Sequence, residues 1–395
     1  MRVLVVSHLY PAPGYERHLF LHEQLVALRR LGVEATVCSP TPLAPRVLWF
    51  RSRWRRFGSK PRRAIRDGIE ATYPRVVVLP RRALFSRSGD LFYLAMRRQL
   101  PAAAGQVDLI HAHQALPDGA ATARMAARLG VPFVVTVHGR DVNAHLPAGG
   151  AVARRTVDTL SRAAAVVAVS GAVARRLAGY VDSDRLHVVP NGVIGGGRAV
   201  APADFLGDKP LVLSVGYLIV SKGHATVLDA LALLRDDHPG IEYAIVGEGA
   251  CEAELRRQAD RLGLAPRVHF LGRLTHDDVL RMMARADLFV LPSAPEGFGL
   301  VYAEAMGQGT PVVACRGEGP QDFVTDGVSG YLVPPRDARA LANAMARAFD
   351  DPDERRRMGE AGSAAVAGLT WDRSAALLLA VYEQVIAETR SETTS

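Results

Sequence analysis

Cysteine, lysine and aromatic residues are scarce in this chain of 395 residues, and it has no long apolar run. The three cysteines, Cys38, Cys251 and Cys315, are far apart and lack the paired spacing of zinc-binding or disulfide-rich proteins. Such a pattern suits core residues of a protein in the reducing cytoplasm. No apolar run approaches the ~20 residues of a membrane span, and no signal-peptide core follows Met1. We therefore expect a cytoplasmic protein, either soluble or peripheral on the inner face of the cell membrane.

The chain is basic, and part of its charge is concentrated in one segment. The formal net charge is +8, with 45 arginines and only three lysines. Between positions 46 and 66 there are nine basic residues and no acidic one: Arg46, Arg51, Arg53, Arg55, Arg56, Lys60, Arg62, Arg63 and Arg66. Four aromatic residues are interleaved with them: Trp49, Phe50, Trp54 and Phe57.

Three interpretations of segment 46–66 are open. Basic residues with aromatic anchors suit an anionic membrane surface, where each basic residue contributes about 1 kcal/mol. A nucleic-acid partner is disfavoured, because no nucleic-acid-binding motif accompanies the segment. A solvated loop with no partner is the third interpretation.

Strand-like and helix-like segments alternate along the chain. Apolar runs such as 3–6 and 132–137 are typical of strands, and 118–129 is typical of a helix that ends at a glycine. After the strand at 34–38, the next strand is expected at 76–79, beyond the basic segment. Repeated strand–helix units predict an α/β protein with parallel, doubly wound sheets.

A break in this alternation predicts two domains. Three consecutive glycines at 195–197 begin a stretch without periodicity that ends near Pro210. A single core seldom grows past about 250–300 residues, so the chain is long enough for two α/β domains. We place the domains at 1–195 and 196–370, followed by a final helical segment at 371–395.

The most informative motif is segment 295–306, PEGFGLVYAEAM, which places Glu296 and Glu304 eight positions apart. Gly297 and Gly299 let the backbone turn tightly and approach a ligand closely. The free N–H groups at the start of the next helix suit a phosphate. The two carboxylates can therefore bind different parts of one elongated ligand, as in a sugar-nucleotide site.

A strand–glycine–helix unit alone indicates only α/β packing, but a turn and buried strand at 307–314 and a further glycine-flanked strand at 327–333 follow it. In order and spacing, this stretch closely resembles the donor-binding half of retaining glycosyltransferases of family 4, whose hallmark is Glu-x7-Glu. The resemblance covers nearly the whole chain. It implies a GT-B fold, with two Rossmann-like domains facing across a cleft and segment 371–395 forming a helix that crosses back to the N-terminal domain.

The resemblance also implies roles for individual residues on the donor side. Glu304 would bind the nucleoside ribose, Glu296 the sugar hydroxyls, and Lys222 the diphosphate, for which a compact ammonium is suited. Lys222 belongs to a Gly-x5-Lys-Gly pattern that starts at Gly216. The chain departs from the family at Tyr217, where the usual residue is a second phosphate-binding arginine. The other implied donor-side positions are Gly14, Gly247, Arg273, Leu274, Phe298, Gly299, Leu300 and Val301.

In the N-terminal half, His138 follows the apolar strand 132–137 and matches the family's His-Gly-x-Asp segment. The match implies that its imidazole lies beside the reacting face of the donor sugar, where it could bind a hydroxyl or stabilise charge. Asp141 either shares this site or caps the following segment. Gly14 either lets backbone N–H groups face phosphate or is an ordinary turn glycine.

Two patterns that resemble metal sites are discounted. Asp182 and Asp184 lie in a polar turn before a strand. His111 and His113 could face the same side of a strand, but no third ligand accompanies them. We expect no metal and no cofactor; the co-substrate would be a nucleotide sugar, with uridine diphosphate the commoner carrier in the family and guanosine diphosphate the alternative.

The expected function is retaining transfer of a sugar to an acceptor hydroxyl, with His138, Lys222 and Glu296 at the catalytic centre. Segment 46–66 favours a lipid-linked saccharide as acceptor, as in envelope or exopolysaccharide assembly. A soluble small molecule or natural product is the enzymatic alternative. Because Tyr217 replaces the arginine, a non-catalytic nucleotide-sugar-binding protein is a second alternative.

Overall fold

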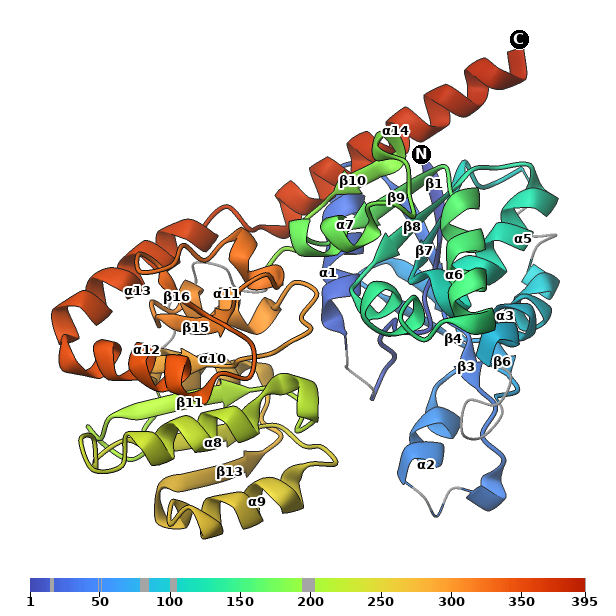
Figure 1. Cartoon of the computed structure of the whole chain (residues 1–395). Helices are drawn as coiled ribbons and strands as arrows, with labels where there is room; N and C mark the ends of the chain where they lie inside the picture. Colours follow the sequence, from blue (N-terminus) through green and yellow to red (C-terminus); the bar gives the residue numbers. More distant parts are fainter. Residues whose placement is uncertain are drawn as a thin grey trace. The chain divides into compact units, whose positions relative to one another are not determined.

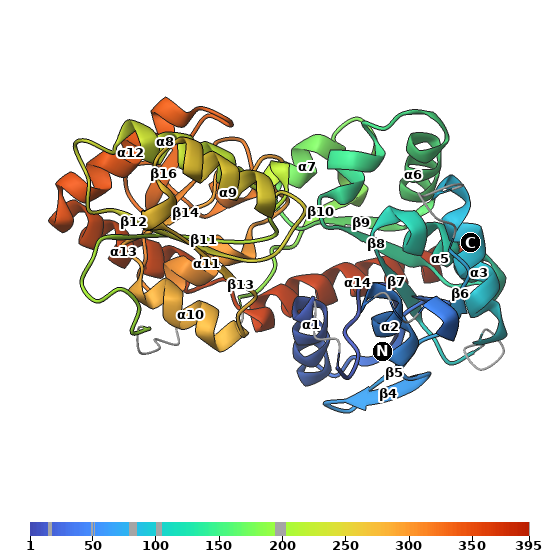
Figure 2. The same ribbon diagram turned by 90° about the horizontal axis from the view of Figure 1, so that it is seen from below.

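The chain folds into two compact units (Figures 1 and 2). The structure, a computed structural model, describes residues 1–14, 18–48, 50, 52–78, 85–99, 105–193 and 203–394. Unit 1 comprises Met1–Gly192 and Trp371–Ser395, and unit 2 comprises Val193–Thr370. The expected boundary between 195 and 196 falls in 194–202, outside the described residues.

Unit 1 is built on an eight-stranded sheet with the strand order β10-β9-β8-β7-β1-β2-β5-β4. Its strands are β1 (Arg2–Val6), β2 (Glu34–Cys38), β4 (Arg63–Arg66), β5 (Ile69–Thr72), β7 (Leu109–His113), β8 (Phe133–Val137), β9 (Ala165–Ala168) and β10 (Leu186–Val188). All neighbours are parallel except β4 and β5. The central strands β7 and β8 are buried throughout, as in parallel sheets covered by helices on both faces.

The main helices of unit 1 are α1 (Leu19–Arg30), α3 (Ser88–Met96), α5 (Ala120–Leu129), α6 (Gly150–Arg162), α7 (Gly171–Leu177) and α14 (Trp371–Thr394). Figure 2 shows α14 beside α1. Arg30 forms an ion pair of 2.5 Å with Asp372, and the buried hydroxyl of Tyr382 lies 2.6 Å from Nδ1 of His111. The last helix therefore completes the core of the unit that contains the first strand.

Within the described part of the chain, one helical stretch, 352–391, is long and apolar enough by length and composition to cross a membrane. Within it, the buried side chains of α14 include Ala375, Leu378, Tyr382 and Val385. Their spacing of three or four residues places them on one face of the helix. That apolar face is used for packing in unit 1.

The excursion between β2 and β5 differs from the prediction. It contains β3 (Thr41–Pro42), η1 (Arg46–Leu48), α2 (Ser52–Ser59) and β4. The prediction that the next strand after 34–38 lies at 76–79 is wrong, because β3, β4 and β5 form first. Of the described residues in 76–78, only Val76 is in a strand, the short β6 (Arg75–Val76). Asp67 and Gly68, both with positive φ, join β4 to β5 as a tight hairpin. The polar composition of this edge hairpin hides it from a search for apolar strands.

Unit 2 has a fully parallel six-stranded sheet with the order β13-β12-β11-β14-β15-β16. Its strands are β11 (Leu211–Val215), β12 (Glu242–Val246), β13 (Val268–Gly272), β14 (Leu288–Val290), β15 (Val312–Cys315) and β16 (Gly330–Val333). Its helices are α8 (His224–Leu233), α9 (Glu252–Arg261), α10 (His276–Arg285), α11 (Leu300–Gly307), α12 (Ala338–Asp350) and α13 (Pro352–Val366).

The core of unit 2 lies on both faces of its sheet. Val212 belongs to one buried apolar cluster, whereas its neighbours Leu211 and Leu213 belong to another. Successive side chains of a strand point to opposite faces, so helices cover both sides of β11. The carboxyl ends of the parallel strands therefore meet at one edge, where ligand sites form in such folds.

Candidate active site

The loop from β14 to α11 carries the two glutamates of the sequence motif. Gly299 immediately precedes α11 and has a φ of 86°. A Cβ atom at this position would lie 2.6 Å from the Tyr302 ring and 2.9 Å from Pro320. Only glycine fits this turn, and the turn exposes the first N–H groups of α11, which have no acceptor within the helix.

Glu296 and Lys222 form the charged centre of this edge. Lys222 Nζ lies 2.6 Å from Glu296 Oε2, and both side chains are largely buried. The other carboxylate oxygen of Glu296 accepts a hydrogen bond of 3.1 Å from the N–H of Gly297. The structure thus brings together two residues that are 74 positions apart in the chain.

Glu304 lies inside α11 and is only 8% exposed. Its carboxylate has no hydrogen-bond or ion-pair partner among the described residues, and burial raises its pKa to about 7. A buried carboxyl group without a partner is costly when it is ionised. Donors from a bound ligand would remove that cost.

The loops after β11, β12 and β13 border this site and contact one another at glycines. The N–H of Gly216 donates to Val246 O, and the N–H of Gly247 donates to Gly272 O. A Cβ atom on Gly247 would lie 1.8 Å from Gly216 O, so the loops after β11 and β12 are in direct contact. The loop after β13 follows, with Arg273 exposed and Leu274 half-buried. Lys222 is positioned by the first of these loops.

Two donor-side positions after Glu296, Phe298 and Val301, have side chains packed against other residues of unit 2. Phe298 is 5% exposed and packs on Phe323, with ring centroids 5.4 Å apart. Val301 packs against the buried core of unit 2, and Leu300 is half-buried as the first residue of α11. These residues can therefore contribute backbone N–H groups rather than exposed side chains.

Tyr217, at the position of the family's arginine, is 48% exposed. Arg140 and Arg316 are candidate replacements for that arginine. Arg316, in unit 2, binds Asp326 at 3.0 Å and Leu332 O at 3.0 Å. Its guanidinium is therefore already engaged.

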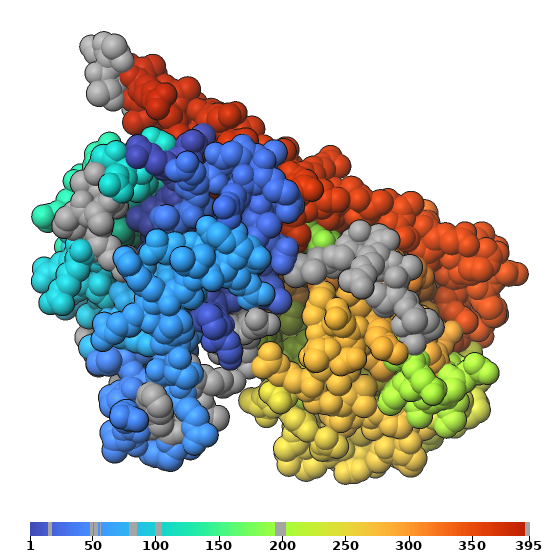
Figure 3. Space-filling model, turned by 180° about the vertical axis from the view of Figure 1, so that it is seen from behind, coloured from blue at the N-terminus to red at the C-terminus, as the bar shows by residue number. Residues whose placement is uncertain are grey.

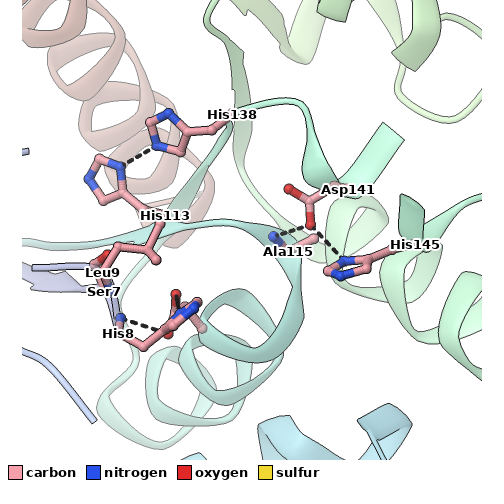
Figure 4. Close-up of polar contacts among 9 residues, drawn as sticks. Ser7, His8, Leu9, His113, Ala115, His138, Asp141 and His145 are labelled. Carbon is pink, nitrogen blue, oxygen red and sulfur yellow. Dashed lines mark hydrogen bonds and ion pairs between the residues drawn. The ribbon is translucent and has the colours of Figure 1, made fainter. Parts of the chain in front are cut away.

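His138 lies at the carboxyl end of β8 in unit 1 and stacks on His113 (Figure 4). His113 Nδ1 and His138 Nε2 are 2.9 Å apart. Burial lowers the pKa of His138 to about 4 and that of His111 to about 3, and lowers the pKa of His113 well below its ordinary value. At neutral pH His138 is thus an uncharged hydrogen-bonding group and not a cation.

Asp141 is buried, and its side chain contacts the loop after β7 instead of capping the segment that follows it. Its Oδ1 accepts a hydrogen bond of 3.0 Å from the N–H of Ala115 and lies 3.3 Å from His145 Nδ1 (Figure 4). Neither contact is to a backbone N–H of the segment that Asp141 begins. Its Oδ2 is buried with no partner among the described residues. Asp141 holds the loop after β7 against the loop after β8.

A histidine–aspartate pair in unit 1 was not predicted from the sequence. His8 is labelled in Figure 4. Its Nδ1 lies 2.7 Å from Asp118 Oδ2, and its N–H donates to Asp118 Oδ1. Burial lowers the pKa of His8, but the attraction of Asp118 outweighs it and the net shift is upward. The position of His8 after β1, at the carboxyl edge of the sheet, is the signal that could have drawn attention to it.

His111 and Asp182, which were discounted as metal ligands, have partners in the structure, and Gly14 has a left-handed backbone conformation. His111 Nε2 lies 2.7 Å from Thr136 Oγ1, and Asp182 binds Arg185. Gly14 has a φ of 73°, and a Cβ atom there would meet no neighbour. Among the described residues, no three His, Cys, Asp or Glu side chains are grouped as metal ligands would be.

The two halves of the chain match two family profiles. Residues 14–194 match Glycosyltransferase Family 4, and residues 201–365 match Glycosyl transferases group 1. The MMP alpha-(1->4)-mannosyltransferase of Mycolicibacterium hassiacum is 31% identical over 314 residues, covering 75% of each chain.

Other relatives differ in how much of their length is matched. TuaC of Bacillus subtilis, whose name assigns it to teichuronic acid biosynthesis, is 28% identical over 363 residues, covering 88% of this chain and 89% of TuaC. The lipopolysaccharide core biosynthesis glycosyltransferase LpsE of Rhizobium meliloti is 34% identical over 207 residues, covering 51% of this chain and 59% of LpsE.

Solved structures share the fold. Sucrose-phosphate synthase from Thermosynechococcus elongatus superimposes with a TM-score of 0.81 at 24% identity, covering 98% of this chain and 100% of that one. HepE from Anabaena, solved with UDP and glucose, gives 0.73 at 24% identity, covering 99% of this chain and 100% of HepE. These likenesses identify the GT-B fold, and the family matches identify the activity class. The chain belongs to glycosyltransferase family 4, the retaining enzymes that use nucleotide sugars.

Proposed function

We propose that unit 2 binds a nucleoside diphosphate sugar along the carboxyl edge of its sheet. Glu304 accepts hydrogen bonds from the ribose, Glu296 binds the sugar hydroxyls, and Lys222 with the N–H groups at Gly299 and Leu300 binds the diphosphate. The observation that carries this assignment is the arrangement around α11. A lysine–glutamate pair lies beside the loop that starts the helix. Inside the helix lies the buried carboxylate of Glu304, which has no partner among the described residues.

The reaction is proposed to proceed at the front face of the sugar. The bond between the anomeric carbon and the diphosphate breaks as the acceptor oxygen attacks from the same side, and the departing phosphate takes the acceptor's proton. Lys222 and the helix N–H groups stabilise the negative charge that develops on the diphosphate. His138 is proposed to bind a sugar hydroxyl as a neutral imidazole, since its pKa is lowered to about 4.

A thermal-shift panel tests the donor assignment. UDP-glucose, UDP-galactose, UDP-N-acetylglucosamine and GDP-mannose are added separately to the whole chain. A donor present at 100 times its Kd stabilises the native state by about 2.7 kcal/mol. Stabilisation by one of them that is lost in Glu304→Gln supports the site. Because HepE was solved with UDP and glucose, we propose uridine as the base and keep guanosine in the panel. If none of these compounds raises Tm, the donor assignment is wrong.

The acceptor is proposed to be a lipid-linked saccharide of envelope or exopolysaccharide assembly, reached by peripheral attachment to the inner membrane face. Figure 3 shows the blue surface around α2 projecting from unit 1. Within segment 46–66, Val47, Phe50 and Ile65 are 78%, 73% and 75% exposed. Basic groups with exposed apolar side chains suit an anionic bilayer surface. The names of TuaC and LpsE, both from envelope assembly, support this choice.

One residue of the basic segment does not face solvent. Lys60 is 5% exposed, its ammonium lies over the Tyr73 ring, and burial lowers its pKa to about 8. Lys60 therefore packs against Tyr73 inside the segment between β2 and β5, and not on the surface. The membrane contact is proposed for Arg55, Arg62 and Arg63, which are exposed.

Liposome flotation tests the membrane proposal. We expect the wild-type chain to float with vesicles that contain phosphatidylglycerol and not with pure phosphatidylcholine vesicles. Arg62→Glu with Arg63→Glu should reduce flotation, whereas Arg256→Glu with Arg257→Glu on α9, in unit 2, should not. Failure of the wild-type chain to bind the anionic vesicles would favour a soluble acceptor.

The non-catalytic alternative suggested by Tyr217 has its own test. Release of free nucleoside diphosphate from a nucleotide sugar by the wild-type chain would exclude this alternative.

A further inference from the structure

The backbone of Glu296 is held by a second acidic residue from the neighbouring loop. Glu318 follows β15, the strand that pairs with β14. Its Oε2 accepts a hydrogen bond of 2.7 Å from the N–H of Glu296, and it is only 7% exposed. A bond from an N–H to an ionised carboxylate is about twice as strong as one between neutral groups.

A second bond runs between the same two loops. The N–H of Gly319 donates to Glu296 O at 3.2 Å. A Cβ atom on Gly319 would lie 2.4 Å from Gly297 O and 2.6 Å from Phe298 Cα. Glycine at 319 therefore permits this contact. The loop after β15 thus bonds to both the N–H and the carbonyl of Glu296, through Glu318 and Gly319.

The side chain of Glu318 bonds to the Glu296 N–H and does not cap the short helix that begins beside it. It is the N-cap residue of the short helix η10 (Gly319–Asp322), and its side chain makes no capping bond to that helix. Glutamate is not a preferred N-cap residue, and a serine or aspartate would serve the helix better. The side chain reaches instead across to the next loop, which carries the glutamate paired with Lys222.

We propose that Glu318 is a positioning residue that sets the orientation of Glu296 toward the donor sugar, an inference that rests on the proposed function of Glu296. With its N–H, its carbonyl and both carboxylate oxygens engaged, Glu296 has little freedom. Misplacement of a reacting group by about 1 Å can reduce a rate about 100-fold. Glu318 would thus act on turnover while leaving the nucleotide contacts of Glu304 intact.

The test compares Glu318→Ala, Glu318→Gln and the control Glu360→Ala, an exposed glutamate on α13. Release of nucleoside diphosphate is measured with the donor that the thermal-shift panel selects. We expect Glu318→Ala to lower kcat about 10- to 100-fold, with KM changed less than about 3-fold. The amide oxygen of Glu318→Gln can accept the same bond and should restore kcat to within about 5-fold of wild type. The stabilisation by UDP should remain in all variants.

Amide hydrogen exchange at Glu296 gives a readout that needs no activity. Exchange should be faster in Glu318→Ala than in Glu318→Gln or the control. Wild-type kcat in Glu318→Ala, equal impairment of both Glu318 variants, or unchanged exchange at Glu296 would overturn the proposal. If the wild-type chain releases no nucleoside diphosphate from any donor, the proposed function fails; the exchange measurement still decides whether Glu318 holds the Glu296 backbone.

Discussion

The two glutamates of the Glu-x7-Glu motif have different surroundings, and this difference separates their roles. Glu296 is paired with Lys222 and bonded to a backbone N–H. Glu304 is buried without a partner among the described residues, and its pKa is raised to about 7. A carboxylate that already has a cation can orient a sugar, whereas an isolated one gains most from hydroxyl donors.

The raised pKa of Glu304 predicts pH-dependent nucleotide binding. Ribose hydroxyls donate to the ionised carboxylate, so binding lowers this pKa and releases a proton near pH 7. We expect UDP affinity to rise between pH 5.5 and 7.5, and the calorimetric binding enthalpy to change with the ionisation enthalpy of the buffer. Proton release should vanish in Glu304→Gln and persist in Glu360→Gln. A pH-independent affinity would contradict this account.

The same shift affects the stability of the free protein. The pKa of Glu304 is higher in the folded state than its ordinary value of 4.5. Its stabilising contribution is therefore complete below about pH 4.5 and lost as the pH rises through about 7. The loss is on the order of 3 kcal/mol, since each unit of pKa difference corresponds to about 1.4 kcal/mol. Urea unfolding at pH 5 and pH 8 should show that Glu304→Gln loses less stability than wild type; equal losses would contradict the assignment.

Sequence reasoning found the residues whose type and spacing form a motif, but not those joined only by the fold. Lys222 and Glu296 were found because both belong to family patterns, and the fold brings them to 2.6 Å. His8 and Asp118 are 110 positions apart and belong to no such pattern. Glu318 was missed because its importance lies in a bond to a backbone N–H.

At the scale of elements, the start of α11 decides the geometry of the site. Gly299 and Gly309 flank this helix and have similar positive φ values, 86° and 79°. Their surroundings differ, because a Cβ atom would collide with Tyr302 at Gly299 and meet nothing within 4 Å at Gly309. An alanine at Gly309 would therefore meet backbone strain alone, whereas an alanine at Gly299 would meet backbone strain and a steric clash.

Replacement of each glycine by alanine should show this difference. Gly309→Ala is expected to cost about 1 kcal/mol, the penalty of a left-handed conformation for a residue with a side chain. Gly299→Ala should cost at least about 2 kcal/mol more, because the Tyr302 ring or the loop must shift. Urea unfolding measures both values, and equal costs would show that the Gly299 turn adapts without strain.

Elements with long apolar runs were predictable, and the polar edge of the sheet was not. The run at 132–137 correctly indicated β8, all of whose residues are buried. Exposed and half-buried residues alternate in β4, buried and half-buried residues alternate in β5, and both strands carry charge, so they lacked the apolar signal. Its Asp67-Gly68 turn was the available cue.

At the scale of the whole molecule, the chain returns to its first unit through α14. Leu378 on this helix is fully buried, whereas the adjacent Leu377 is 41% exposed. Leu378→Ala should destabilise the protein by about 2–5 kcal/mol, since it leaves a cavity. Leu377→Ala should cost less than about 1 kcal/mol. Chemical denaturation distinguishes them, and equal effects would show that α14 contributes little to the core of unit 1.

The proposed function depends most on Glu296 orienting the donor sugar while its bond to the diphosphate breaks. The most direct measurement is the rate of nucleoside diphosphate release by wild type and by Glu296→Gln, with UDP-dependent thermal stabilisation measured in parallel. We predict release by wild type, a fall of at least about 100-fold in kcat for the variant, and retained stabilisation by UDP through Glu304. Full turnover by Glu296→Gln would contradict the role assigned to Glu296.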